Sequence, residues 1–109
     1  MSIEMPEATI LARQMDVIAD KGAYCHYGPG IAGYACGVAS SLYRFANFRY
    51  RCRIAYTNRQ VGGPFRGFGA PQVNFAIDCQ LDRIAADLGL DPLEIRLRNV
   101  NRPGDTTSC

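Results

Sequence analysis

Residues Gly62 to Gln72 read Gly-Gly-Pro-Phe-Arg-Gly-Phe-Gly-Ala-Pro-Gln, and the rest of the chain is organised around them. This glycine-rich turn leads into a helical pattern that begins near Ala70 and Pro71. Glycine lets a backbone approach a ligand closely, and a helix N-terminus presents unpaired N–H groups with a partial positive charge. Arg66 adds a forked donor for anions. The stretch therefore suits an anion such as a phosphate, with a plain turn as the alternative.

An amphipathic helix is predicted directly after this turn, over Ala70 to Leu88. Its apolar face carries residues at helical spacing: Val73, Ile77, Leu81, Ile84 and Leu88. Proline is tolerated in the first turn of a helix, and Gly89 is a natural stop. Asp91 then predicts the N-cap of a short helix from Pro92 to about Asn99, with Glu94 as its capping-box partner.

Two strands are predicted before the turn. Over Asn47 to Thr57, aromatic and apolar side chains alternate with three arginines, which indicates a half-buried strand. The arginine face is either functional, solvated, or an edge that discourages pairing with another strand. The second strand is predicted over Ile10 to Ala19, and a short extended piece over Ala23 to Tyr27.

Between these strands, Gly28-Pro29-Gly30 interrupts the chain, and Ile31 to Leu42 has apolar residues at helical spacing. Small residues fill its other positions, so this helix is expected to pack closely against something, such as a neighbouring domain. Gly33 and Gly37 each weaken it by about 1 kcal/mol relative to alanine. Residues 1–9 are a lead-in without a clear preference. The element order predicts an α+β fold, a small β-sheet with helices packed on one side.

Composition limits the class of protein. A chain of 109 residues, 48% hydrophobic and 20% charged, forms one globular domain at most, with a modest core. Its five cysteines show neither a C-x-x-C pair nor a His/Cys ligand spacing, which favours reduced thiols over disulfides or zinc. There is no apolar run of membrane-spanning length and no signal pattern. We therefore expect a cytoplasmic protein with no membrane partner.

Charge is distributed unevenly although the net charge is only +2. No Asp or Glu occurs between Lys21 and Ile77. The basic residues of that span are Lys21, Arg44, Arg49, Arg51, Arg53, Arg59 and Arg66. Such a basic middle suggests an anionic partner, either a small ligand or a nucleic acid. The alternative is that these side chains pair with acids elsewhere in the chain or on a neighbouring one.

Five motifs, in order and at matching spacing, resemble a known family. Phe65 to Gln72 is similar to the cofactor-contacting segment of the large molybdenum subunit of the xanthine dehydrogenase and aldehyde oxidase family. The supporting motifs are Asp20 to Tyr24, Tyr56 to Asn58, Leu88 to Asn99 and Arg102 to Asp105. The resemblance runs from about Ile10 to Thr107, so it covers most of the chain.

The resemblance implies that residues 1–109 are a single partial molybdenum-cofactor-binding domain, a fragment of the molybdopterin-binding domain. Phe65, Arg66 and Gly67 fall where the family contacts the molybdenum-pterin (molybdopterin) cofactor. Phe68 falls where the family places an aromatic ring against the substrate. The complete enzyme would be an oxidoreductase that oxidises an aldehyde or an aromatic heterocycle. Its electrons would pass to iron–sulfur and flavin subunits or domains.

The chain also departs from the family. Purine-hydroxylating members carry a substrate-binding arginine where this chain has Tyr34. The resemblance therefore implies that Tyr34 binds substrate with Phe68, and that an aldehyde, another heterocycle or an acyl-CoA aromatic fits better than a purine. The family's catalytic glutamate, its glutamine loop and its second glycine-rich loop have no counterpart here. We therefore expect no catalytic or metal-binding residue in the chain, no hydroxylase activity and no firmly bound cofactor without the remaining parts of the molybdenum subunit.

Two other functions fit parts of the sequence. Arg66-Gly67-Phe68-Gly69 begins like the RNP1 signature of an RNA-binding domain, but Pro71 would interrupt the strand that RNP1 needs. The chain would otherwise be a non-catalytic structural or oligomerisation module, because faces that were interfaces in a larger subunit drive association. His26, the only histidine, is expected to be structural. We expect no nucleic-acid partner, and oligomers of the isolated chain.

Overall fold

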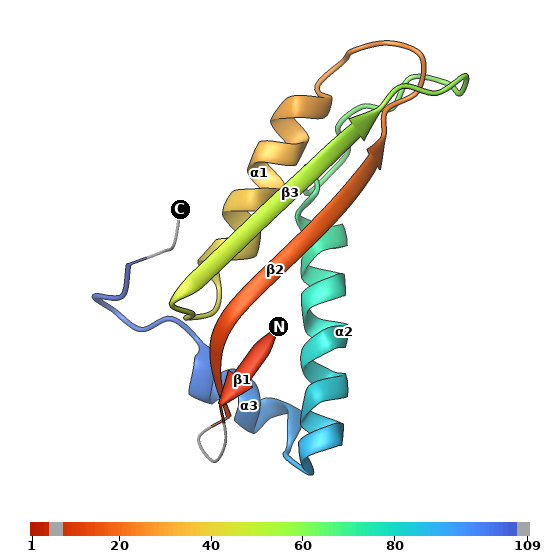
Figure 1. Cartoon of the computed structure of the whole chain (residues 1–109). Coiled ribbons are helices and arrows are strands. Elements are labelled where there is room, and N and C mark those ends of the chain that lie inside the picture. Colours follow the sequence, from red (N-terminus) through yellow and green to blue (C-terminus); the bar gives the residue numbers. More distant parts are fainter. Residues whose placement is uncertain (5–7, 107–109) are drawn as a thin grey trace.

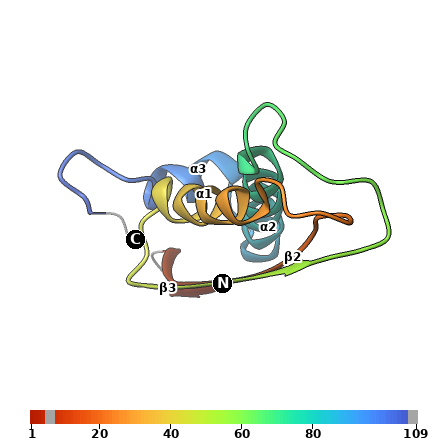
Figure 2. The ribbon, with the colours of Figure 1, turned by 90° about the horizontal axis from the view of Figure 1, so that it is seen from above.

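Two layers make up the structure, a small β-sheet and three helices on one of its faces (Figure 1, Figure 2). The computed structural model describes residues 1–4 and 8–106. The elements are β1 (Ser2–Glu4), β2 (Thr9–Asp20), α1 (Gly28–Ser41), β3 (Asn47–Ala55), α2 (Ala70–Leu88) and α3 (Pro92–Asn99). In the sheet order β1-β2-β3, β1 is antiparallel and β3 parallel to β2. The predicted α+β fold with helices on one side is confirmed.

The parallel pairing of β2 and β3 determines where the loops meet. Parallel strands need a long crossover connection, and α1 supplies it. Both strands therefore end on the same side of the molecule. The connection from β2 to α1 and the connection from β3 to α2 leave from that side (Figure 1). This carboxyl end of parallel strands is where open α/β sheets commonly bind ligands.

The core lies between the sheet and the helices. α2 contributes its buried residues at every fourth position: Val73, Ile77, Leu81 and Ala85. The bounds of this helix match the prediction, whereas its innermost stripe passes through Ala85 rather than the half-buried Ile84 and Leu88. Asn99 is a buried polar residue that joins the end of α3 to the start of β2. Its side-chain oxygen accepts from the Ile10 N–H, and its side-chain nitrogen donates to the Ala8 and Ile95 carbonyls, each at 2.8 Å. Among the described residues, no helix has both the length and the hydropathy to cross a membrane.

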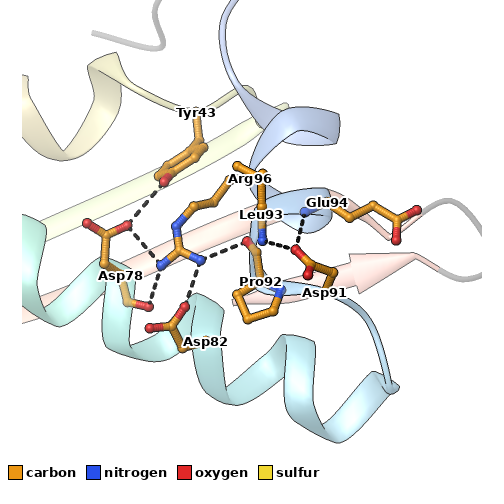
Figure 3. A network of polar contacts seen from close by, with 8 residues as sticks. All are labelled: Tyr43, Asp78, Asp82, Asp91, Pro92, Leu93, Glu94 and Arg96. Atoms are coloured by element: carbon orange, nitrogen blue, oxygen red, sulfur yellow. Dashed lines mark hydrogen bonds and ion pairs between the residues drawn. The ribbon is translucent and has the colours of Figure 1, made fainter.

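A polar network fastens α3 to α2 (Figure 3). Arg96 donates to the Pro92 carbonyl at 2.8 Å and pairs with Asp82 at 2.7 Å. Its other terminal nitrogen lies 3.1 Å from the Asp78 carbonyl and 3.4 Å from the Asp78 carboxylate. The Tyr43 hydroxyl donates to that carboxylate at 3.1 Å. Arg96 therefore connects α3 to α2, and the Asp78 carboxylate extends this connection to Tyr43, which follows α1.

The predicted N-cap of α3 is confirmed. The Asp91 carboxylate accepts from the Leu93 N–H at 2.6 Å and the Glu94 N–H at 3.2 Å (Figure 3). Glu94 differs from the capping-box prediction, since its carboxylate is bonded to Arg98 one turn further along. An i,i+4 partner of opposite charge thus competes successfully for the Glu94 side chain.

Three local predictions differ from the structure. Ala23 to Tyr27 forms bends rather than an extended piece, because Gly22 turns the chain with φ +76° and its carbonyl accepts from Thr57. α1 begins at Gly28 instead of after Gly30, since Pro29 fits the first turn of a helix. The lead-in also contains β1, which lies against the beginning of β2.

The predicted alternation along β3 is confirmed. Its aromatic and apolar residues are half-buried on the helix side, while Arg49, Arg51 and Arg53 are exposed on the other face. Figure 2 shows that no element covers that face. Arg51 lies opposite Asp16 in the strand register and pairs with it at 2.5 Å. This face is uncovered within the described residues, and β3 is an edge strand of their sheet.

Part of the basic middle is neutralised within the chain. The pairs join basic residues to acids of the flanking segments: Arg44 with Asp105, Arg51 with Asp16, and Arg59 with Asp20. Arg49, Arg53 and Arg66 form no ion pair with the described residues. Among these three, only Arg66 belongs to the glycine-rich turn, so it is the cation there that is open to an external anion.

Candidate functional site

The candidate site is the turn over residues 62–69, which we call the glycine turn, at the carboxyl end of β2 and β3. Phe68 donates its N–H to the Phe65 carbonyl at 3.0 Å, and Ala70 donates to the Gly67 carbonyl at 2.8 Å. Gly67, Phe68 and Gly69 have consecutive φ values of +90°, +50° and +94°. The RNA-binding interpretation is wrong at this point, since residues 66–69 form a turn and not a strand.

Close approach explains the glycines of this turn. A Cβ on Gly67 would lie 2.5 Å from Pro71 Cγ, and a Cβ on Gly69 would lie 3.0 Å from Ile31 Cγ2. Gly69 is the N-cap of α2 in a left-handed conformation. Side chains at either position would therefore push the turn away from α1 or from the start of α2.

An aromatic cluster forms beside the turn. The Phe68 ring meets Tyr34 edge to face at 5.7 Å between centroids, and meets Tyr27 at 6.0 Å. Tyr34 and Phe68 are the two residues predicted to bind substrate, and the structure places them in contact. Tyr27 was missed because its segment was predicted to be extended, whereas it is the N-cap of α1. The Gly-Pro-Gly that follows it is the sequence signal that could have placed it there.

His26 lies next to this cluster. Its ring contacts Tyr27 at 5.7 Å between centroids, and its Nδ1 lies 3.0 Å from where a Cβ on Gly63 would be. The residue is nevertheless exposed, so it packs only loosely between the glycine turn and the start of α1. Its structural role stays a prediction.

Phe65, Arg66 and Gly67 lie at the outer edge of the turn. Phe65 is 90% exposed and Arg66 is exposed. The backbone N–H groups of Arg66 and Gly67 form no hydrogen bond to the described part of the chain. Open amides and an arginine without a carboxylate partner are donors for an anion, and they fit an anionic cofactor. Phe65 would have to bury its ring against something outside this chain.

A cavity of about 440 Å³ lies between the glycine turn, the ends of the strands and the two long helices. Its lining is mostly apolar, with Asp20, Lys21, Arg66 and Gln72 as polar members near the turn. Lys21 is only 4% exposed, and its ammonium lies 4.9 Å from the centre of the Tyr56 ring. Contact with the Cys25 thiol raises the pKa of Lys21, and Lys21 in turn lowers the pKa of Cys25. Lys21 thus adds a buried positive charge next to the turn.

Tyr50 lines the inner end of the same cavity, on the half-buried face of β3. Burial raises the pKa of Tyr50 to about 12, and the neighbouring Cys52 adds to this rise. The phenol is therefore neutral at physiological pH. The charges of the cavity, Lys21 and Arg66 against the single acid Asp20, thus lie near the turn, whereas its inner end is neutral.

Comparison with known proteins agrees with this geometry. The family described as the molybdopterin cofactor-binding domain matches residues 5–100. The chain is 41% identical over 99 residues to the xanthine dehydrogenase molybdenum-binding subunit of Escherichia coli, covering 91% of this chain and 13% of that protein. It is 40% identical over 100 residues to the aldehyde oxidoreductase of Megalodesulfovibrio gigas, covering 92% of this chain and 11% of that protein.

A solved structure shows the same likeness in three dimensions. The aldehyde oxidoreductase from Desulfovibrio gigas superposes with a TM-score of 0.85 at 40% identity, over 91% of this chain and 11% of that one. The chain therefore spans only 11% to 13% of the length of these relatives. Residues 5–100 carry both the sequence match and most of the described fold.

Proposed function

This chain belongs to the molybdopterin cofactor-binding domain family, as a segment of the kind found in xanthine dehydrogenases and aldehyde oxidoreductases, and we propose that its glycine turn contacts the cofactor. Phe65, Arg66 and Gly67 are the contacting residues. The observation that carries this proposal is the exposed Arg66 beside two open backbone amides, with no ion pair to the described residues. Donors of this kind complement the negative charge of a pterin phosphate or dithiolene.

Phe68 and Tyr34 then line the substrate side of the same site. Phe68 is half-buried and fixed from two sides by tyrosine rings, so its free surface has a defined orientation. A fixed ring of this kind positions a flat or unsaturated substrate by stacking or edge contact. Tyr34 offers a hydroxyl but no positive charge, which favours an aldehyde or an aromatic heterocycle other than a purine. When bound, the molybdenum-pterin group supplies the two-electron redox chemistry, and these residues supply position.

The complete enzyme is larger than this chain in our proposal. Residues 1–109 form one partial domain, and the remaining parts of the molybdenum subunit complete the cofactor pocket. Iron–sulfur and flavin subunits or domains accept the electrons, and the assembly is cytoplasmic. The four cysteines in the described residues form no disulfide with one another. The chain alone turns over no substrate of the family, because the base and the other cofactor loops lie elsewhere.

The proposal is tested by placing the chain in a complete enzyme. Its residues replace the matching segment of the Megalodesulfovibrio gigas aldehyde oxidoreductase, to which it is 40% identical. The variants are Arg66→Ala for the cofactor contact and Phe68→Ala for the substrate side. Arg59→Gln serves as the control, since Arg59 is an exposed arginine outside the glycine turn. Molybdenum, pterin and the steady-state constants are measured for each protein.

We expect stoichiometric molybdenum and pterin in the chimera and in Arg59→Gln. Arg66→Ala should lose molybdenum and pterin by about tenfold, the effect of about 1.4 kcal/mol from a charge-assisted contact. Phe68→Ala should keep its cofactor and lose kcat/KM. Equal cofactor content in Arg66→Ala and Arg59→Gln would refute the cofactor contact. The purified chain alone, assayed in parallel, should contain neither molybdenum nor pterin.

A further inference from the structure

Lys21 is a buried cation whose position is set by the fold. It follows the last residue of β2 and is 4% exposed. Its N–H donates to the Ala55 carbonyl at 3.1 Å, and its carbonyl accepts from the Gly62 N–H at 2.8 Å. Its side chain runs along Gly28, where a Cβ would lie 2.9 Å from the Lys21 Cδ and Cε. The backbone bonds and the space left by Gly28 therefore determine where the ammonium lies.

The ammonium of Lys21 has no carboxylate partner among the described residues. It lies 4.9 Å from the centre of the Tyr56 ring and is hydrogen-bonded to the side chain of Cys25. The Tyr56 hydroxyl contacts the same thiol. The neighbouring acid, Asp20, is engaged by the Thr57 hydroxyl instead. The Cys25 thiol is therefore the group that can supply a negative charge to the buried ammonium.

Ionisation of Cys25 is favoured by these contacts. The ammonium of Lys21 lowers the pKa of the Cys25 thiol, and the contact with Tyr56 lowers it further. A buried cation is stabilised by an opposite charge, and a thiolate is stabilised by two donors. The thiol lies 3.9 Å from the His26 carbonyl, which is too long for a strong hydrogen bond to retain its proton. Cys25 is also exposed, so a reagent in solution can reach its sulfur.

The other cysteines of the described residues lack this combination. Cys36 and Cys52 are half-buried. Cys79 is exposed, but it lies on α2 and follows the acid Asp78 in the chain. Reactive cysteines are those that are accessible and lie beside a positive charge, whereas buried thiols are inert. Cys79 is therefore a reference for exposure, and Cys25 adds the contact with a lysine to that exposure.

We propose that Cys25 is a nucleophilic thiolate that reacts with small disulfides and forms a reversible modification site beside the glycine turn. The sulfur of Cys25 attacks one sulfur of a disulfide R–S–S–R, and a mixed disulfide Cys25–S–S–R forms as the S–S bond of the reagent breaks. The other half leaves as the thiolate RS⁻. Lys21 and Tyr56 hold the attacking sulfur in its charged form and change no covalent bond.

The modification would alter the surroundings of the glycine turn. Cys25 is followed by His26, whose Nδ1 lies 3.0 Å from where a Cβ on Gly63 would be. A mixed disulfide at Cys25 adds bulk next to this contact and removes the negative charge that faces Lys21. The reaction does not depend on the proposed cofactor contact, because it requires residues of this chain alone.

The rate of modification at each cysteine of the full chain tests the proposal. Dithiodipyridine is the probe, since it is an uncharged disulfide at neutral pH and is not attracted by the lysine. Mass spectrometry of peptides, with fragment ions that separate Cys25 from Cys36, measures the extent of reaction over time. We expect Cys25 to react about fivefold faster than Cys79 at pH 7, because its larger thiolate fraction outweighs its lower intrinsic nucleophilicity. Excess small thiol should reverse the modification.

Two variants separate the effect of the charge from that of exposure. Lys21→Met keeps an unbranched side chain, and it should slow Cys25 to about the rate of Cys79 while leaving Cys79 unchanged. The Cys25 rate should also level off at a lower pH in the unmodified chain than in Lys21→Met. Tyr56→Phe keeps the ring and should slow Cys25 about twofold, which preserves the test if Lys21→Met fails to fold. Equal rates at Cys25 and Cys79 in the unmodified chain, or an unchanged Cys25 rate in folded Lys21→Met, would overturn the proposal.

Discussion

The contacts of its ring hold Phe68 in a left-handed backbone conformation that a non-glycine residue rarely adopts. A non-glycine residue with φ +50° costs about 1–2 kcal/mol relative to an ordinary conformation. The two edge contacts with Tyr27 and Tyr34 are worth about 0.5–1.5 kcal/mol each, so they offset that cost. Gly67 and Gly69 on either side continue the left-handed path. The ring is thus fixed by its neighbours and not by its own backbone preference.

The first prediction concerns the glycine that ends this path. Gly69→Ala should lower the free energy of unfolding by about 2 kcal/mol, because alanine is strained at φ +94° and its Cβ would press on Ile31. Gly33→Ala should raise it by about 1 kcal/mol, because Gly33 is inside α1 with nothing within 4 Å of a Cβ. Urea unfolding of both variants measures the difference. Destabilisation of equal size in both would show that the turn geometry has been assigned incorrectly.

The second prediction concerns the pH dependence of the connection between β2 and the glycine turn. The Asp20 carboxylate accepts from the Thr57 hydroxyl at 2.6 Å and the Gly22 N–H at 3.0 Å, and these bonds lower its pKa below the ordinary 3.8. A lowered folded-state pKa means that the stabilisation is complete above the unfolded-state value near 3.8. It is lost as the pH falls through the lower folded-state value.

Asp20→Asn should therefore unfold at a lower temperature than the unmodified chain at pH 7, and the gap should narrow as the pH is lowered from 7 to below 3.8. Thr57→Val removes the larger of the two causes and should reduce the same acid-sensitive difference. Thermal unfolding across this pH range gives the comparison. A gap that stays constant over the range would mean that ionisation of the Asp20 carboxylate does not stabilise the fold.

At the scale of elements, the sequence predicted the regular structure well because its periodic signals agree with its caps. The three-arginine alternation identified β3, and the Pro71 and Gly89 ends identified α2. The prediction of an extended piece over Ala23 to Tyr27 was wrong because distant hydrogen bonds impose another conformation. Thr57 donates its N–H to the Gly22 carbonyl, and Ala23 donates to the Arg59 carbonyl, each more than thirty residues away. β1 was missed because three residues carry no periodicity, and they form a strand only by pairing with β2.

The site was predictable only in part, for the same reason. Phe65, Arg66 and Gly67 came from a motif that is contiguous in sequence, and their roles remain predictions. The contact of Phe68 with Tyr34 joins residues on different elements, and it follows from the packing of the glycine turn on α1. Tyr27 and Lys21 lie in or beside the segment whose conformation was predicted incorrectly. Neither stands out by residue type alone.

The third prediction concerns the cap of α3. Asp91→Ala should lower the free energy of unfolding by about 1 kcal/mol, because the Leu93 and Glu94 N–H groups lose their acceptor. Asp87→Ala is the control, since Asp87 is exposed near the C-terminal end of α2, where a negative charge opposes the helix dipole. That variant should be neutral or slightly stabilising. Chemical denaturation measures both, and equal losses would contradict a specific role of the cap.

At the scale of the whole molecule, the chain is extended for its length. Its Cα radius of gyration is 15.6 Å, whereas a compact domain of 109 residues would have about 13 Å. The helices cover one face of the sheet only, and several large apolar side chains are exposed (Figure 2). Gly33 and Gly37 of α1 face open space, with nothing within 4 Å of a Cβ. These surfaces have the character of interfaces to further protein.

The last prediction concerns two exposed leucines on one face of α3. Leu93 and Leu97 lie one turn apart on α3 and are 62% and 60% exposed, so they form a continuous patch. Ile18 is 68% exposed but lies opposite Arg53 in the strand register, among the charged residues of the open sheet face. Association of the isolated chain should therefore use the α3 patch and not Ile18.

Sedimentation velocity over a tenfold or greater concentration range tests this. The unmodified chain should self-associate, and Leu93→Ser combined with Leu97→Ser should shift it toward the monomer. Removing two exposed leucine contacts forfeits about 3 kcal/mol of burial, which is more than a hundredfold in the association constant. Ile18→Ser removes one apolar side chain that is as exposed as either leucine and should leave the distribution unchanged. A chain that stays monomeric throughout, or one that responds equally to both changes, would show that the α3 patch is no interface, and the surface used by the rest of the subunit would have to lie elsewhere.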